Sequence, residues 1–360
     1  MKITFPAMKG FIGGRTYYTT QMPLNVVPRV LAFADAELEP QDREQRKLTT
    51  KRVPDIANYI TENDGEGYLF SAITASHRDG VTFLAAVGLE GIGTLEVDLS
   101  KANFLINDGQ HRAAAIEMAL KQMPSLGEDS ITVILFPYEN KARAQQMFSD
   151  LNRYVKKTSK SIDILFDHRD IVARVTREVA NAVPAFTGLV EMEQTSLSAG
   201  SKMLFTLAAL HDATVELLHN RDSEENTQNE LTARAIEYWA AISKVIPEWG
   251  RVRRGDISAR EFRMENISSH SVVLRALGAV GAELIRDQPH NWKERLEGLR
   301  AVDWKKANAD WEGVNIVANS VVSNRQARAA TKAYIKSHLG MQLTDTEQKA
   351  VVRPSSPRAA

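Results

Sequence analysis

The segment NFLINDGQHRAAAIEMALKQM, residues 103–123, indicates a strand, a tight turn and a helix, with His111 and Arg112 in the first helical turn. The first amide hydrogens of a helix have no intrahelical partner, and the peptide dipoles leave this end partly positive. Cationic side chains there are mildly destabilising unless an anion lies among them. Gly109 lets the backbone approach a ligand closely, and the Arg112 fork matches phosphate oxygens. The turn therefore predicts an anion-binding site.

Two anions fit this prediction, and the pattern alone leaves both open. One is a phosphate held by the turn residues Asp108, Gly109, Gln110, His111 and Arg112. The other is a protein carboxylate that pairs with Arg112, in a helix that Asp108 caps.

A second basic segment follows one strand and one helix later, in MFSDLNRYVKKTSKS. Residues 141–160 contain one acidic residue, Asp150, and six cations, which leaves a surplus of five positive charges. The cations are Lys141, Arg143, Arg153, Lys156, Lys157 and Lys160. Nearby hydroxyl groups, from Tyr154 to Ser161, add hydrogen-bond donors for phosphate. Such a run is often only a solvated face. Because it follows the turn in a chain without net charge, we interpret it as the other wall of the anion site.

Two more basic stretches lie in the second half of the chain. Arg325, Arg328, Lys332 and Lys336 fall within about 80° of one another on a helical projection. The segment RVRRGDISAREFR, residues 251–263, has five arginines, including Arg251, Arg253 and Arg254, against Asp256 and Glu261. Both stretches indicate either contact with a DNA backbone or an ordinary exposed face.

Three acidic residues, Asp163, Asp167 and Asp170, share one face of an expected helix. They could hold a hard cation, but a solvated acidic face is the commoner explanation, and we predict no metal site. The chain has no Cys residue, which excludes disulfides, thiolate nucleophiles, iron–sulfur clusters and cysteine-based zinc sites. No phosphate-binding GxxxxGK loop is present either.

Size and composition indicate an ordinary globular protein with two domains. The chain has 360 residues, of which 43% are hydrophobic and 25% charged. Lys plus Arg equals Asp plus Glu at 45 each, so any contact with nucleic acid must come from local basic patches. The first residues contain no apolar signal segment and the chain has no long apolar run, so we expect a soluble cytoplasmic protein without membrane contact.

The elements that would position these residues change in character along the chain. Short strand-like runs are predicted at residues 15–20, 68–75, 83–88, 93–99, 103–106 and 131–137, with helices at 110–123 and at 140–150, the latter capped by Asn140. The glycines of KGFIGGRTYY predict a hairpin turn. Long amphipathic helices are predicted over residues 159–184, 201–219, 229–246, 267–286 and 323–339. We therefore predict an α+β domain over residues 1–170, a helical domain over 171–345 and a flexible tail over 346–360.

The residues also resemble a known family. FLINDGQHRAAAI resembles the signature of the DGQHR-domain proteins, in particular the DndB family of DNA sulfur modification, or phosphorothioation. The segments GGRTYYTTQMP, SDLNRYVKKTSKSI and SAGSKMLFTLAAL resemble DndB-type sequences too, so the resemblance covers most of the chain.

More remotely, the first domain is similar to the ParB and sulfiredoxin superfamily. In ParB-type domains a GxxR turn and a later segment cradle nucleotide phosphates, which here implies roles for Gly109–Arg112 and for Asp150–Arg153, including Asn152. The resemblance thus implies a mixed-sheet domain followed by an all-α domain, with a nucleotide such as CTP or ATP as the candidate cofactor. Sulfiredoxins carry their reactive cysteine where this chain has Gln110, so that sulfur chemistry is not available here.

The resemblance implies a DNA-binding negative regulator of the modification genes. Its partners would be double-stranded promoter DNA and other DNA sulfur-modification proteins, and a repressor that reads paired half-sites is expected to be a homo-oligomer. The alternative is a ParB-like nucleotide hydrolase or DNA-nicking enzyme, with Arg112 and Arg153 stabilising phosphoryl charge and Asp108 or His111 as general base or acid. A third hypothesis is an adaptor with an apolar patch on the helices at residues 201–219 or 267–286.

Overall fold

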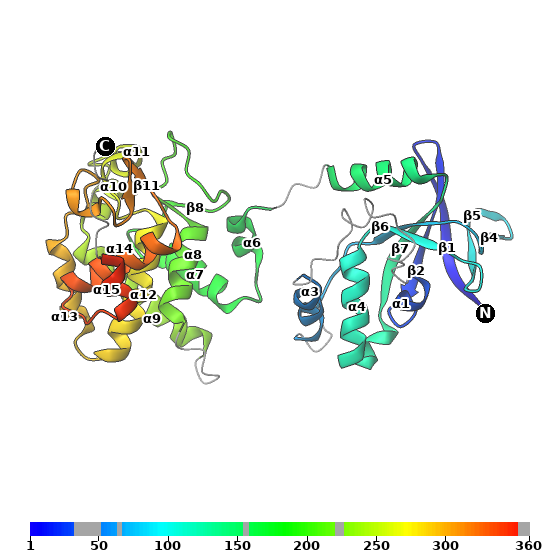
Figure 1. Ribbon diagram of the computed structural model, residues 1–360, viewed down its shortest axis with the longest axis horizontal. Coiled ribbons are helices and arrows are strands. Elements are labelled where there is room, and N and C mark those ends of the chain that lie inside the picture. Colours follow the sequence, from blue (N-terminus) through cyan, green and yellow to red (C-terminus); the bar gives the residue numbers. More distant parts are fainter. Residues whose placement is uncertain (32–51, 63–66, 154–157, 220–226, 352–360) are drawn as a thin grey trace, which may run out of the picture. The chain divides into compact units, whose positions relative to one another are not determined.

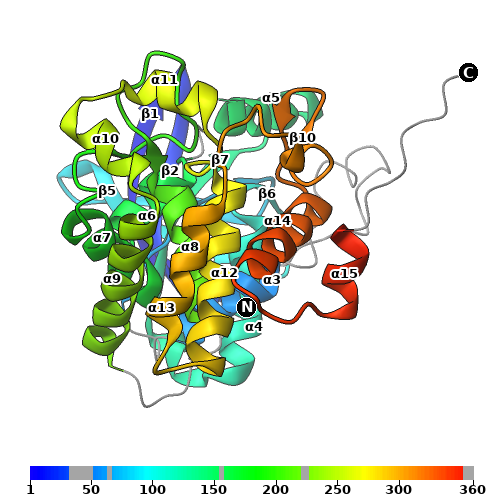
Figure 2. The same cartoon turned by 90° about the vertical axis from the view of Figure 1, so that its left-hand side faces the viewer.

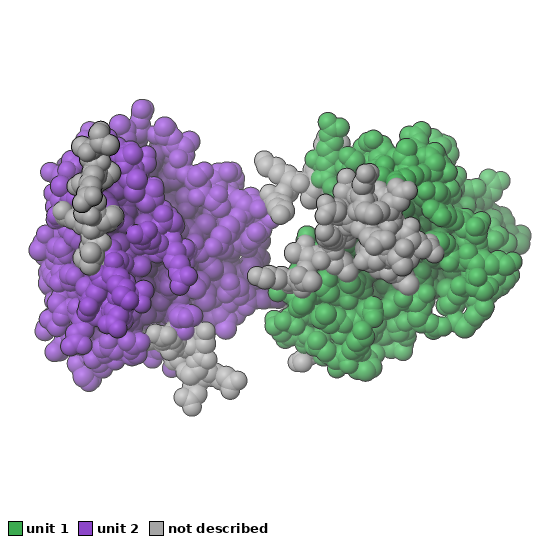
Figure 3. Space-filling view, in the orientation of Figure 1, with its two compact units in different colours: residues 1–156 green, residues 157–360 purple. Residues whose placement is uncertain are grey.

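The computed structural model describes residues 1–31, 52–62, 67–153, 158–219 and 227–351. It divides the chain into two units, Met1–Lys156 and Lys157–Ala360, each with its own hydrophobic core (Figure 3). The predicted boundary at residue 170 is too late. Ile164 packs into the core of the second unit, and the Ser161 hydroxyl donates to the Gln194 carbonyl, so the helix that carries them belongs to that unit.

A seven-stranded mixed sheet forms the frame of the first unit (Figure 1). Its strands are β1 (Lys2–Ile12), β2 (Arg15–Pro23), β3 (Ile73–His77), β4 (Val81–Ala86), β5 (Leu89–Asp98), β6 (Phe104–Asp108) and β7 (Ser130–Pro137). They lie in the order β4-β5-β1-β2-β7-β3-β6. Only the β3–β7 pair is parallel within the described part of this sheet. All six predicted strands overlap observed ones.

Strand β1 was not predicted, because its proline and glycine interrupt the pattern of a strand. Pro6 nevertheless pairs with Thr94 of β5, and its carbonyl accepts a hydrogen bond from the Thr20 hydroxyl. Gly13 and Gly14, at φ 55° and 77°, make the predicted hairpin turn between β1 and β2.

The described helices of the first unit are α1 (Val27–Val30), α3 (Arg52–Thr61), α4 (Gln110–Gln122), the 3₁₀ helix η2 (Pro124–Glu128) and α5 (Lys141–Arg153). Helix α4 packs beside α3 and buries Ala115, Ile116 and Ala119 in the core (Figure 1). Asn140 accepts a hydrogen bond from the Arg143 amide at 3.0 Å, which confirms its predicted capping of α5.

The second unit is mostly helical. Its helices are α6 (Lys160–Phe166), α7 (Ile171–Ala182), α8 (Leu207–Leu218), α9 (Gln228–Val245), α10 (Glu248–Arg254), α11 (Ala259–Glu265), α12 (Ser271–Asp287), α13 (Trp292–Leu296), η3 (Glu297–Ala301), η4 (Ala309–Trp311), α14 (Arg325–His338) and α15 (Asp345–Val351). The prediction of an all-α domain needs a small correction, because two short ladders are present. These pair β8 (Val190–Glu191) with β9 (Phe205–Thr206), and β10 (Ile316–Val317) with β11 (Ser320–Val321).

Helix α12 lies at the centre of this unit, against α8 on one side and α14 on another (Figure 2). Ten of its residues are buried, and Gly278 allows the close approach to α8, because a Cβ atom there would lie 2.1 Å from the Ala213 carbonyl oxygen. The apolar faces of α8 and α12 therefore pack against each other. The described surface does not present them as the apolar patch that the adaptor hypothesis needs.

The predicted flexible tail is wrong for residues 346–351, which belong to helix α15. Glu347 on this helix is 5% exposed and bonds to Lys336 of α14 at 2.7 Å. This docking gives α15 a tertiary partner that local sequence does not reveal. The rest of the predicted tail, residues 352–360, lies outside the described residues.

Candidate functional site

The DGQHR turn joins β6 directly to α4. Gly109 is the residue before the first helical residue, and it adopts φ 99° and ψ 14°, a left-handed conformation that glycine tolerates best. No side chain caps this helix start. The prediction that Asp108 caps α4 is therefore wrong, because its carboxylate is engaged elsewhere.

The anion that pairs with Arg112 is the Asp108 carboxylate. Nη2 of Arg112 donates to Asp108 Oδ2 at 2.5 Å, and Nη1 donates to the carbonyls of Ser71 at 2.5 Å and Ala72 at 2.9 Å. The Ser71 hydroxyl accepts a further bond from Nη1. Since the Arg112 side chain is only 14% exposed, the guanidinium is part of the fold. It ties the turn to the segment that enters β3.

Gly109 is packed against this ion pair. A Cβ atom at position 109 would lie 3.1 Å from Ile73 Cγ1 and 3.3 Å from the Arg112 guanidinium carbon. The glycine therefore serves both the left-handed turn and the close approach of the arginine. Asp108, Gly109 and Arg112 form a structural unit, which we call the DG-R bracket.

Gln110 and His111 are half-buried at the open first turn of α4. Burial lowers the pKa of His111, and the positive charge of Arg52 lowers it further, although Asp108 opposes both effects. The imidazole is therefore neutral at pH 7, and the earlier expectation of a cation here applies to Arg112 and not to His111. A neutral histidine can still donate one hydrogen bond to an anion.

The predicted second wall lies on α5, which packs beside β6. The buried Asn107 side chain of β6 donates to the Ala144 carbonyl of α5 at 3.5 Å. Asn152 donates to the Phe148 carbonyl of its own helix, and Arg153 is exposed at the end of α5. Whether these two residues and the turn bind one phosphate stays a prediction. Lys156 and Lys157 lie outside the described residues.

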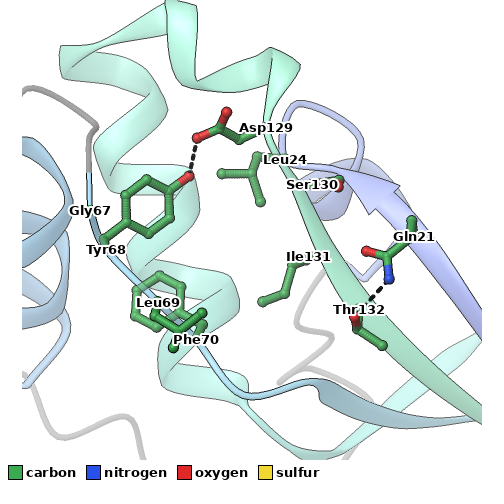
Figure 4. A pocket seen from close by; sticks show the side chains of 10 residues that line it. All are labelled: Gln21, Leu24, Gly67, Tyr68, Leu69, Phe70, Asp129, Ser130, Ile131 and Thr132. Carbon is green, nitrogen blue, oxygen red and sulfur yellow. Dashed lines mark hydrogen bonds between the residues drawn. The ribbon is translucent and has the colours of Figure 1, made fainter.

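A pocket of about 400 Å³ lies beside the segment that enters β3 (Figure 4). Tyr68 and Asp129 close one side, with the tyrosine hydroxyl donating to Asp129 Oδ2 at 2.5 Å. Burial, together with this carboxylate, raises the pKa of Tyr68. Gln21 and Thr132 form the other polar side through a hydrogen bond of 2.8 Å. Sequence reasoning missed this pocket because its residues come from distant segments.

A basic groove of about 440 Å³ lies in the second unit, between the end of α9 and helix α10. Lys244, Arg253 and Arg254 line it, and Arg251 is exposed on the same short helix. The structure thus brings two of the predicted arginines of RVRRGDISAREFR, Arg253 and Arg254, to a concave surface. Lys244 was not predicted, although its place in the last turn of an expected helix was a signal for an exposed cation.

The predicted basic stripe on α14 is only half present. Lys332 pairs with Glu283 at 2.5 Å and Glu347 at 3.0 Å, and Lys336, which is 2% exposed, pairs with the same two carboxylates at 2.8 and 2.7 Å. The helical projection could not show that two carboxylates from other helices cover this face. Arg325 is exposed and Arg328 half-buried, so these two residues alone keep the predicted role.

Two other predicted surface features serve structural contacts. Lys160 pairs with Asp212 of α8. Asp167 accepts hydrogen bonds from the amides of Arg169 and Asp170, and Asp170 caps α7 by accepting from the Val172 amide. These bonds divide the helix predicted over residues 159–184 into α6 and α7.

The described residues lack two further features. They contain no group of three or more His, Asp or Glu side chains suited to holding a metal ion. Within the same ranges, none of the helices combines the length and the apolar character needed to span a bilayer.

The family model DndB, described as DNA-sulfur modification-associated, matches residues 5–342. The chain belongs to the DndB family. The DndB match begins in β1 and ends just before α15, so it includes the DG-R bracket, the basic groove and most of both units. Membership implies involvement in DNA sulfur modification. No curated protein and no solved structure gave a match, so the ParB-like character of the first unit stays a prediction.

Proposed function

We propose that this DndB-family protein is a DNA-binding negative regulator of the phosphorothioate modification genes. The observation that carries the proposal is the basic groove between α9 and α10. Lys244, Arg253 and Arg254 line this groove together with small and apolar residues, and no carboxylate is among the lining residues. A concave surface with several cations attracts a polyanion and holds its phosphates in register.

The groove suits a DNA backbone better than a buried small ligand. Its lining includes Pro184, Ala185 and Ala240, which offer few groups for specific recognition. Arg254 also pairs with Asp256 at 2.9 Å, which leaves Lys244 and Arg253 as the principal phosphate ligands. Because the whole chain has no net charge, this local patch would supply the electrostatic attraction.

Salt-dependent binding of promoter DNA tests this proposal. The full chain is titrated by fluorescence anisotropy against a promoter duplex from the modification genes and against a scrambled duplex, over a range of salt concentrations. Affinity should fall steeply with salt, by about 0.9 log units per log unit of salt for each neutralised phosphate. Arg253→Gln should weaken binding and reduce that slope by about 1.

Two controls separate the groove from other basic surfaces. Lys305→Gln removes an exposed cation of the same unit outside the groove and should leave affinity and slope unchanged. Arg325→Gln tests the remaining part of the α14 surface. If the promoter duplex binds no better than the scrambled duplex, or if Arg253→Gln behaves like Lys305→Gln, the proposal is wrong.

The nucleotide that the family resemblance implies would bind at the start of α4, where no side chain caps the helix. Since Arg112 already has a carboxylate partner, we propose that CTP or ATP would bind through the helix amides, Gln110 and His111, with Arg112 holding the turn in place. Repeating the DNA titration with and without CTP or ATP tests a coupling between the two sites. The hydrolase alternative gains no specific support, because Asp108 would have to leave Arg112 to act as a base.

A further inference from the structure

A second polar pocket, of about 260 Å³, lies in the helical unit at the start of α12. Hydroxyl groups and one cation dominate its polar wall: Thr195, Ser196, Thr206, Ser269, Ser271 and Arg263. Leu197, Leu204 and Phe205 form an apolar wall. This combination of hydrogen-bonding groups and apolar side chains in one lining is typical of a site for a small polar ligand.

Two side chains of the pocket have polar atoms without a partner. Ser269 is only 7% exposed, and its hydroxyl has no hydrogen-bond partner. The neighbouring His270 Nε2 is also buried without a partner. Leaving a buried polar group unpaired costs about 1–3 kcal/mol, so such groups are uncommon in a fold unless a ligand or water satisfies them. Both residues are among those that line the pocket.

The backbone adds donors at the same place. Helix α12 runs from Ser271 to Asp287, and no side chain caps its start. The first amides of a long helix point out of its N-terminus, where the peptide dipoles favour negative charge. The Ser269 hydroxyl and the His270 ring therefore lie beside backbone amides that could donate hydrogen bonds to an oxyanion.

The charges around the pocket are positive and lack acidic partners. The guanidinium of Arg263 donates to the backbone carbonyls of Ser198 and Ser201, both at 3.0 Å, and of Met203. Lys306 donates to the Arg263 carbonyl at 2.7 Å. Neither cation forms an ion pair within the part of the chain that the structure describes. Two half-buried cations without a carboxylate leave a local positive potential.

The ionisation of His270 agrees with this potential. Burial, together with the charges of Lys306 and Arg263, lowers its pKa to about 4, although a hydrogen bond with the Arg263 backbone opposes these effects. The imidazole is therefore neutral at pH 7. Its single N–H is used in the hydrogen bond to the Arg263 carbonyl, which leaves Nε2 as an acceptor.

We propose that this pocket binds the phosphate group of a small phosphate ester, of about the size of a nucleoside monophosphate. The Ser269 hydroxyl, the start of α12 and the charge of Arg263 would hold the phosphate oxygens. Leu197, Leu204 and Phe205 would contact the organic part of the ligand. The site is distinct from both the DGQHR turn and the basic groove, and it gives the helical unit an effector site of its own.

Calorimetric titration of the full chain tests this assignment, with inorganic phosphate, AMP and CMP as the probes. The nucleotides should bind more tightly than inorganic phosphate, because only they reach the apolar wall. Ser269→Ala should weaken each probe by about tenfold, the loss of one hydrogen bond to a charged group. Ser320→Ala, at an exposed serine of the same unit, should leave binding unchanged.

Charge and folding are tested by a second pair of variants. Lys306→Met should weaken all three probes, whereas Lys305→Met, at the exposed neighbour, should not. Because the Ser269 hydroxyl has no partner, Ser269→Ala should keep the thermal midpoint of the parent, while AMP should raise the midpoint of the parent by more than that of the variant. Absence of binding by every probe, or equal binding by Ser269→Ala, would falsify the proposal.

Discussion

Asp108, Gly109 and Arg112 hold one another in place at the turn between β6 and α4. The carboxylate and the guanidinium pair at 2.5 Å across one helical turn, and the glycine provides the room for that pair. The most conspicuous motif of the chain is thus a bracket that positions the start of α4. The ligand-binding role of Gln110 and His111, between the bracket residues, stays a proposal.

Gly109→Ala tests the bracket. The left-handed φ of 99° and the contact with Ile73 at 3.1 Å should together cost about 1–3 kcal/mol of unfolding free energy. Gly88→Ala is the matched control, because Gly88 has φ 75° but nothing within 4 Å of its added Cβ. Urea unfolding followed by far-UV circular dichroism should show the larger loss for Gly109→Ala. Equal losses would mean that the close packing at the turn contributes nothing.

Helices α14 and α15 show how a charged stripe becomes part of a core. Lys332 and Lys336 of α14 meet Glu283 of α12 and Glu347 of α15. Burial would raise the pKa of Glu347, but hydrogen bonds from Lys336, the Thr344 amide and Lys332 outweigh it and lower the pKa to about 2. The carboxylate therefore stabilises the folded state in its ionised form.

The stabilisation by Glu347 should depend on pH in a defined way. A folded-state pKa of about 2, below the ordinary value of 4.5, means that the contribution is complete above pH 4.5 and is lost as the pH falls toward 2. Glu347→Gln should lower the thermal midpoint at pH 7 and reduce its fall below pH 4.5. Asp345→Asn, exposed on the same helix, is the control. A variant that retains the full acid sensitivity of the parent would contradict this role for Glu347.

At the scale of the whole molecule, the two units have separate cores and different spectroscopic signals. All five tryptophans lie in the helical unit, and all are at most 8% exposed: Trp239, Trp249, Trp292, Trp304 and Trp311. Tryptophan fluorescence therefore reports on this unit alone. Because the two cores share no residue, we expect each unit to unfold in its own transition.

Two glycine variants test that independence. Gly109→Ala should shift the transition seen by circular dichroism while leaving the midpoint seen by tryptophan fluorescence unchanged. Gly278→Ala should lower the fluorescence midpoint, because its Cβ would lie 2.1 Å from the Ala213 carbonyl oxygen. Parallel shifts of both signals in Gly109→Ala would show that the units unfold as one, because circular dichroism alone reports on the first unit.

Local pattern was sufficient for much of the architecture. Alternation and turn residues indicated the strands after β1, and three- and four-residue spacing indicated the long helices, because each depends on neighbours in the chain. The same local reasoning predicted the Gly13–Gly14 hairpin and the Asn140 cap. It failed at β1, where Pro6 is tolerated only because of how the strand pairs with its neighbours.

The sequence by itself determined the kinds of element, their order and the family to which the chain belongs. Only the tertiary structure decided which partner each charge meets. Arg112 bonds to Ser71 and Ala72, about forty residues earlier, and Lys336 is buried by Glu283 and Glu347 from other helices. Periodicity reports the face on which a side chain lies, but desolvation and ion pairing depend on what packs over that face. For the same reason, only the tertiary structure shows that the Ser269 hydroxyl and His270 Nε2 are buried without a hydrogen-bond partner.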